Sequence, residues 1–162
     1  MASLTYRPGS KQDPSYAHED GTHTLLVTDI MQKGTAPQVY RALTDPVLLR
    51  DWTGTDATAT DEGTAWRIPA LGLAATSSGE VEGETVAVEL RLDGWQTSPS
   101  VASIRLWPVP HSTLLVINHR HLAAADLDRA RELWAPQVLD RLRRWVAANA
   151  PSMRRVGIVA RP

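Results

Sequence analysis

The sequence contains no cysteine and no phenylalanine among its 162 residues. Without cysteine it can form no disulfide, thiolate metal site or iron–sulfur cluster, and it has no cysteine nucleophile. Without phenylalanine, the aromatic part of the core has to come mainly from the six tryptophans. No stretch approaches the roughly 18 consecutive apolar residues of a membrane-spanning helix, and the opening segment MASLTYRPGSKQDPS has no apolar signal region. We therefore expect a cytoplasmic protein that does not associate with a membrane.

The sequence also lacks an excess of positive or negative side chains. The 17 lysines and arginines nearly balance the 18 aspartates and glutamates, so the formal net charge is −1. Such a chain has no general attraction for phosphate backbones, and we expect no nucleic-acid partner. The hydrophobic share of 43% and the charged share of 22% are ordinary for a globular protein. A chain of this length buries a substantial core as one domain.

The chain divides into three parts. Residues 1–20 are polar, with several prolines and glycines and few aliphatic side chains, which indicates a flexible N-terminal arm. Residues 21–150 carry the periodic apolar patterns of a folded domain. Residues 151–162 begin with a proline and form a basic C-terminal tail beyond the last predicted helix.

The first half of the domain predicts a strand and two short helices. Residues 22–33 are rich in β-branched and aliphatic side chains, which favours a strand. Pro37 suits the first turn of a helix, with Thr35 before it as the cap. The pair Asp45-Pro46 breaks this helix and begins the second.

The second half predicts antiparallel strands followed by one long helix. Alternating apolar residues indicate strands between residues 53 and 122, with Ser77-Ser78-Gly79 in a turn. Between Asp126 and Asn149 the apolar spacing changes to three and four, which predicts a helix with a kink at Pro136. The element order is that of an α+β domain in which one helix covers a curved sheet.

Three segments carry a resemblance to a known family: APQVYRALTDPVLLRDW at 36–52, EGTAWRI at 62–68 and STLLVINHRHL at 112–122. In this order, with Trp134 in the long helix, they resemble the AHSA-like branch (activator of the heat-shock chaperone ATPase) of the START/SRPBCC superfamily, which includes the birch-pollen allergen. The resemblance covers roughly residues 22–149. It implies a helix-grip fold: a curved antiparallel sheet of six to seven strands around a long C-terminal helix, with two short helices after the first strand.

The resemblance also implies a function class. The superfamily includes lipid and hormone carriers, polyketide aromatases and cyclases, cochaperones, and self-resistance proteins that capture enediyne antibiotics. It therefore implies binding of a bulky hydrophobic small molecule, such as an aromatic polyketide or an enediyne-type natural product, in an internal cavity. Binding would then serve self-resistance, by sequestration or by self-sacrifice.

Two other classes stay open. One is an aromatase/cyclase-type enzyme that uses a cavity histidine as a proton shuttle. The other is a cochaperone-like interaction domain, which predicts a filled core and an exposed apolar patch. We expect a monomer or a weak homodimer in each case.

The candidate site lies on the last predicted strand and the long helix. The family pattern places Leu115, Ile117 and His119 on the inward face of the strand, and His121 shares their parity. His119 and His121 are thus the candidates for acid–base chemistry, although no catalytic role is assigned. The alternative is that His119 is a hydrogen-bonded core residue and His121 lies at a solvated strand end. The residues expected to contact the ligand are Trp66, Trp95, Leu115, Ile117, His119, His121, Trp134 and Val138.

The sequence offers no motif for a cofactor or a metal ion. It contains no G-x-S-x-G elbow, P-loop or G-x-G-x-x-G fingerprint. His119 and His121 could both reach one ion, but no third ligand follows at a recognisable spacing. We expect neither a cofactor nor a metal site.

Overall fold

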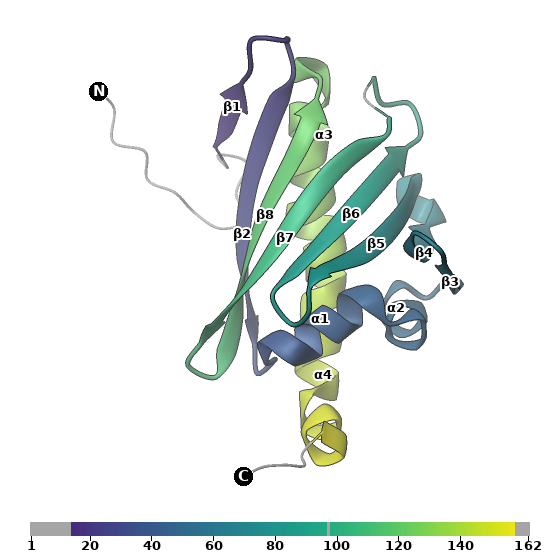
Figure 1. The fold of residues 1–162 in the computed structure, drawn as a ribbon, viewed down its shortest axis with the longest axis vertical. Coiled ribbons are helices and arrows are strands. Elements are labelled where there is room, and N and C mark those ends of the chain that lie inside the picture. The colour runs from purple at the N-terminus through teal and green to yellow at the C-terminus, as the bar shows by residue number, and fades with distance from the viewer. Residues whose placement is uncertain (1–13, 97, 158–162) are drawn as a thin grey trace.

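The computed structural model describes the backbone of residues 14–96 and 98–157 and the side chains up to residue 149. Within this part of the chain, eight antiparallel strands form one open sheet in the order β1-β2-β8-β7-β6-β5-β4-β3 (Figure 1). The strands are β1 (Ser15–Ala17), β2 (His23–Gln32), β3 (Ala57–Thr60), β4 (Gly63–Ile68), β5 (Leu73–Val81), β6 (Thr85–Leu92), β7 (Ser100–Val109) and β8 (Ser112–Leu122). The α+β helix-grip prediction is confirmed, with eight strands in place of six or seven.

The structure differs from the sequence predictions at two places in the sheet, and each difference has a simple cause. β1 lies inside the segment expected to be a flexible arm, because its three residues pair with His23–Leu25 at the edge of β2. Residues 1–13 of that arm lie outside the described residues. The predicted turn at Ser77-Ser78-Gly79 is wrong, because these residues belong to β5 and pair with Ala87 and its neighbours on β6. Ser77 is buried there, on the face that packs against the helices.

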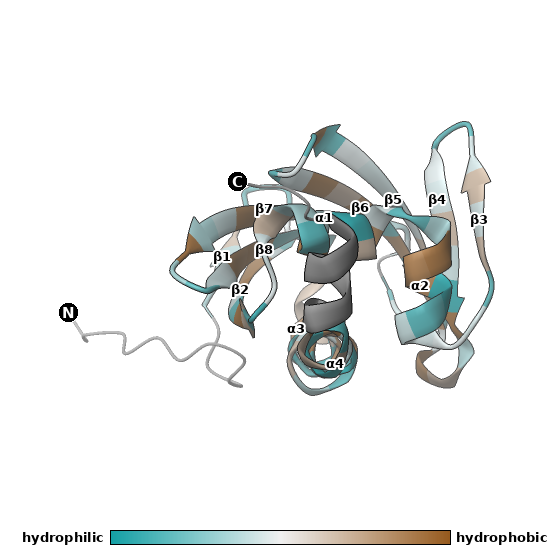
Figure 2. Ribbon diagram, turned by 90° about the horizontal axis from the view of Figure 1, so that it is seen from below, coloured by the Kyte–Doolittle hydropathy of each residue, from teal (hydrophilic) through white to brown (hydrophobic). Residues whose placement is uncertain are grey.

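The two short helices are α1 (Ala36–Thr44) and α2 (Pro46–Thr53), as their start signals predict. Thr35 and Gln38 form a reciprocal capping box at the start of α1. Asp45 caps α2 by accepting a hydrogen bond from the backbone N–H of Val47. Both helices lie under the concave face of the sheet beside the long helix (Figure 2).

The long helix has three parts: α3 (Leu127–Glu132), a π-helical segment (Leu133–Val138) and α4 (Leu139–Gly157). Pro136 lies in the middle of the π-helical segment. Proline has no N–H to donate and its ring crowds the preceding turn, so the backbone widens here and Leu139 donates to the carbonyl of Trp134. Where the sequence predicts a kink at Pro136, the structure has a π-helical segment. The backbone of α4 continues to Gly157, beyond the expected start of the tail at residue 151.

The core lies between the concave face of the sheet and these helices. Tryptophans supply its aromatic volume: the rings of Trp52 and Trp66 pack 5.5 Å apart, and the indole N–H of Trp52 donates to the carbonyl of Ala42. Trp107 on β7 points to the opposite face and is 44% exposed. None of the described helices is long and apolar enough to cross a membrane.

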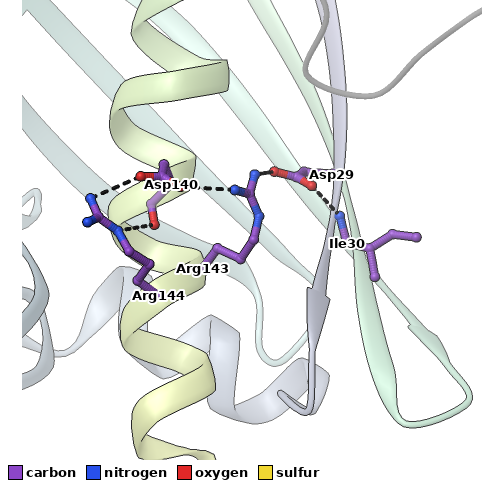
Figure 3. A network of polar contacts seen from close by, with 5 residues as sticks. All are labelled: Asp29, Ile30, Asp140, Arg143 and Arg144. Atoms are coloured by element: carbon purple, nitrogen blue, oxygen red, sulfur yellow. Dashed lines mark hydrogen bonds and ion pairs between the residues drawn. The ribbon is translucent and has the colours of Figure 1, made fainter.

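Polar contacts join the long helix to the edge of the sheet (Figure 3). Arg143 on α4 forms ion pairs with Asp29 on β2 and with Asp140 one turn earlier, and Asp140 also binds Arg144. Asp29 additionally accepts a hydrogen bond from the backbone N–H of Ile30. Because Asp29 is only 13% exposed, its pairing with Arg143 places the helix relative to β2 more firmly than an ion pair in open water would.

Gly34 allows the closest approach between α4 and the end of the sheet. A Cβ at this position would lie 2.6 Å from Cγ1 of Val146, and its carbonyl accepts a hydrogen bond from the buried Thr113 hydroxyl. We predict that Gly34→Ala lowers the free energy of unfolding by about 1–3 kcal/mol through overpacking. Urea denaturation of the purified variant measures this change.

The control is the same substitution in a Val146→Ala background, where the clashing methyl group is absent. There we expect Gly34→Ala to cost less than about 1 kcal/mol, because the two positions are coupled. An equal loss in both backgrounds would show that Gly34 is required for another reason.

Candidate functional site

The candidate site lies where β8 faces the π-helical segment. Leu115, Ile117 and His119 stand on the inner face of β8, and Trp134 and Val138 project from the segment that covers it. All five side chains are buried, with exposed fractions of 2% or less. The structure thus brings together five of the eight residues that the sequence indicates as ligand contacts.

His119 is the polar centre of this region and uses both of its ring nitrogens. The indole N–H of Trp134 donates to Nδ1 over 3.0 Å, and Nε2 lies 2.7 Å from the hydroxyl oxygen of Ser100. Because Nδ1 accepts, the single proton of the neutral imidazole has to lie on Nε2, which donates to Ser100. The rings of His119 and Trp134 meet edge to face, with their centroids 5.9 Å apart.

This environment keeps His119 neutral. Burial lowers the pKa of its imidazole from 6.5 to about 3, because the charged form would lose its hydration. Nε2 carries a proton that points at Ser100, so it cannot act as a base toward that hydroxyl. The Ser100–His119–Trp134 arrangement, hereafter the buried polar trio, is therefore not a nucleophile activated by a histidine.

Ser100 is the member of the trio that sequence reasoning misses. Ala102, Ile104 and Leu106 alternate along β7 and predict its inward face, and the same parity extended by one step includes Ser100. The alternation along β7 is therefore enough to predict that Ser100 faces inward. The pairing of Ala102 with His119, however, follows from the sheet register, which the sequence does not specify.

Two of the predicted ligand contacts lie elsewhere. Trp66 is on β4, four strands away from β8 in the sheet, where its indole N–H donates to Ser77 over 2.7 Å. Trp95 follows β6 and is half-buried against the edge of the core. Neither belongs to the buried polar trio.

His121 does not share the inward face with His119. Opposite Thr24 of β2, β8 contains two residues, Arg120 and His121, so the strand has a bulge at this point. His121 adopts a positive φ of 62° and is exposed, and Leu122 takes the next buried position. The strict alternation used to place His121 fails because the bulge shifts the parity by one residue.

The interior between β8 and the long helix is filled by side chains at this point. His119, Leu115 and Ile117 are fully buried, and Trp134 occupies the space above the imidazole. Three hollows of about 340–430 Å³ open at other places, on the outer face of the sheet, beside the β7–β8 turn and between β2 and α4. Among the side chains that the structure describes, no group of three histidines, aspartates or glutamates is placed to hold a metal ion.

Comparison with known proteins gives one family and a set of similar structures. The sequence model for the family described as activator of Hsp90 ATPase homolog 1-like protein matches residues 33–147. No curated protein sequence matches the chain.

Three solved structures show the similarity of fold. CalU16 from Micromonospora echinospora is 18% identical with a TM-score of 0.61, over 83% of this chain and 81% of CalU16. An HSP90 activator from Plasmodium falciparum is 14% identical with a TM-score of 0.63, over 76% of this chain and 96% of the activator. DynU16, a protein from the dynemicin biosynthetic locus, is 15% identical with a TM-score of 0.59, over 78% of this chain and 49% of DynU16.

The buried, neutral His119 predicts a pH dependence of stability. The unfolded chain binds a proton at this imidazole below pH 6.5, whereas the folded protein does not until about pH 3. The free energy of unfolding should therefore fall by about 1.4 kcal/mol per pH unit as the pH drops through this window, and be unaffected by His119 above it.

Urea denaturation at pH 7 and pH 5 measures this slope, with His119→Gln as the matched variant that keeps a donor near Ser100. The wild type should lose about 2 kcal/mol more than the variant between the two pH values. Equal losses would show that His119 becomes protonated in the folded protein.

Proposed function

The chain belongs to the activator of Hsp90 ATPase homolog 1-like family, and on this premise we propose that it binds a bulky hydrophobic small molecule between the sheet and the long helix. The observation that carries the proposal is the buried polar trio beneath a π-helical segment. The ligand would enter by moving Trp134 away from His119.

Filling the core does not by itself require the buried polar trio. Burying polar groups is costly unless they are hydrogen-bonded, and apolar side chains of similar volume fill a core at least as well. With Trp134 moved aside, Nδ1 of His119 becomes a hydrogen-bond acceptor at the bottom of an apolar pocket. Leu115, Ile117 and Val138 would form its walls. A few placed polar groups in an apolar lining are typical of small-molecule sites.

The π-helical segment is the part of the helix that yields most easily. Its backbone hydrogen bonds are already irregular around Pro136, and such segments occur frequently at functional sites. The segment carries both Trp134 and Val138, so a local shift opens the interior while α4 stays in place. A ligand that buries about 300 Å² of apolar surface contributes roughly 7 kcal/mol before the costs of association. Against this contribution stand the hydrogen bond of about 1 kcal/mol between Trp134 and His119 and the apolar contacts of the buried indole, which the ligand has to replace.

The ligand we propose is an aromatic polyketide or an enediyne-type natural product. The similarity of fold to DynU16, which comes from the biosynthetic locus of the enediyne dynemicin, supports this class. The indole ring of Trp134 would stack on a flat or polycyclic ligand. Binding would protect the producing cell by sequestration or by self-sacrifice. In self-sacrifice the diradical form of an enediyne takes a hydrogen atom from a glycine Cα, and the resulting glycyl radical reacts with dioxygen, which breaks the chain.

An enzymatic role for the histidines has less support. His119 is neutral, fully buried and hydrogen-bonded at both nitrogens, and His121 is exposed beyond the bulge. A proton shuttle of the aromatase/cyclase type would need one of them beside the ligand with a free nitrogen.

We predict that Trp134→Phe tightens binding of an anthracycline or a dynemicin-type enediyne about fivefold. The variant keeps most of the aromatic volume but removes the hydrogen bond of about 1 kcal/mol that holds the site closed. Isothermal titration calorimetry measures the dissociation constants. Trp66→Phe, which loses the hydrogen bond to Ser77, is the matched control and should leave the affinity unchanged.

If neither compound binds the wild type or Trp134→Phe up to its solubility limit, the proposed interior site is wrong. The mass of the protein and of the ligand after incubation then separates the roles. A chain cut at a glycine supports self-sacrifice, an altered ligand with intact protein supports catalysis, and no change supports sequestration.

A second candidate function rests on a different observation. Ile30, Leu114 and Trp107 lie directly opposite one another on β2, β8 and β7, and they form an apolar row on the outer face of the sheet. Ile30 and Trp107 are 42% and 44% exposed, and the guanidinium of Arg105 lies 4.2 Å above the Trp107 ring. An exposed apolar row over a filled core fits a protein-binding surface, and the family description and the Plasmodium structure suggest a chaperone ATPase of the Hsp90 class as its partner.

An ATPase assay tests this second function. Adding the protein should raise the ATP hydrolysis rate of an Hsp90-type chaperone, and Trp107→Ser should remove most of that increase. Val47→Ser is the control, because Val47 is 64% exposed on α2, away from the apolar row. An unchanged ATPase rate at saturating protein would contradict a cochaperone role.

A further inference from the structure

A hollow of about 350 Å³ opens on the outer face of the sheet, where β3, β4, β5 and β6 lie side by side. Most of the residues that line it alternate along the strands with the buried residues of the inner face, and two of those buried residues, Trp66 and Ala75, also border it. Its floor is formed by small side chains, and charged and hydroxyl side chains stand around them. The lining residues that the argument uses are Thr58, Arg67, Ala74, Thr76, Glu89 and Arg91.

The sheet register explains why a hollow forms here. Ala74 lies directly between Arg67 on β4 and Arg91 on β6. Neighbouring strands are about 4.8 Å apart, so the two arginines stand roughly 10 Å from each other across a single methyl group. Two long side chains on either side of a short one leave a slot whose sides are guanidinium groups.

The arginines are available to a ligand. No hydrogen bond or ion pair joins the guanidinium of Arg67 to another of the residues that the structure describes. Arg91 makes one contact, at 3.3 Å to Glu89, and both partners are well exposed. A guanidinium has five N–H donors, so each arginine has several left for a ligand. The hydroxyls of Thr58 and Thr76 stand in the same hollow.

From this arrangement we infer a second binding site, on the face of the sheet opposite the long helix, for a small molecule with a carboxylate or phosphate group on an apolar body. The oxyanion lies over Ala74 and accepts hydrogen bonds from Arg67 and Arg91, which match its geometry in pairs. The apolar body rests on the alanine floor. The site shares no polar side chain with the buried polar trio, so it is independent of the interior ligand.

Amide chemical-shift titration of the isotope-labelled protein tests the site, with benzoate and phenyl phosphate as probes. Both should cause saturable shifts centred on β4, β5 and β6, with a dissociation constant in the millimolar range. The neutral probe benzyl alcohol should cause none, because it lacks the oxyanion. Arg67→Gln and Arg91→Gln should each raise the dissociation constant at least tenfold.

Two further variants make the test specific. Ala74→Leu fills the floor between the arginines without removing a charge, and it should abolish binding. Arg105→Gln removes an arginine from the same face of the sheet but outside the hollow, and it should leave the affinity unchanged.

The inference is overturned if the shifts do not saturate, if Ala74→Leu binds as well as the wild type, or if Arg105→Gln weakens binding as much as Arg67→Gln. Equal binding of benzyl alcohol would overturn the oxyanion assignment. These outcomes do not depend on the interior site, because the titration can be repeated in Trp134→Phe with the same expected result.

Discussion

The long helix and the two short helices together have to cover the concave face of an eight-stranded sheet, and the rest of the structure follows from this constraint. The sheet curves over the helices (Figure 2). Buried residues alternate with exposed ones along its strands. Gly34 lets α4 approach the end of the sheet, and the ion pair between Asp29 and Arg143 holds the helix against β2. Burial of apolar surface supplies most of the stabilising free energy. The inward side chains of β2 therefore depend on the position of the long helix, and those of β3, β4, β5 and β6 on α1 and α2.

The π-helical segment covers part of the sheet, and its backbone is irregular because it contains Pro136. Pro136 prevents a regular α-helix, and the widened backbone directs Trp134 onto His119. In the resulting buried polar trio both nitrogens of a neutral imidazole are hydrogen-bonded, and these contacts stabilise the closed interior. The same contacts are those that a ligand entering from the helix side would have to replace. The proposed ligand binding therefore depends on the movement of Trp134.

The two faces of the sheet offer different chemistry to different partners. The inner face is apolar apart from a few buried hydroxyls and His119. The outer face has the apolar row of Ile30, Leu114 and Trp107 near one end and the arginine-lined hollow near the other. Since residues alternate between the faces, one strand contributes to both: β4 places Trp66 in the core and Arg67 in the hollow. The proposed interior site on the inner face follows from family membership. The proposed site on the outer face follows from the strand register, which aligns Arg67, Ala74 and Arg91.

Local patterns in the sequence were enough to predict the element order, and the family resemblance predicted the inward set of Leu115, Ile117 and His119. Apolar periodicity and capping residues such as Thr35 and Asp45 act within a few positions along the chain, so they can be read without the fold. The partners of His119, the exposed position of His121 and the alignment of Arg67 with Arg91 could not be read in this way. They depend on a bulge, on strand register and on the path of the helix around Pro136, which are set when segments distant in sequence pack together. The sequence therefore indicates which side chains are available, and packing selects the ones that meet.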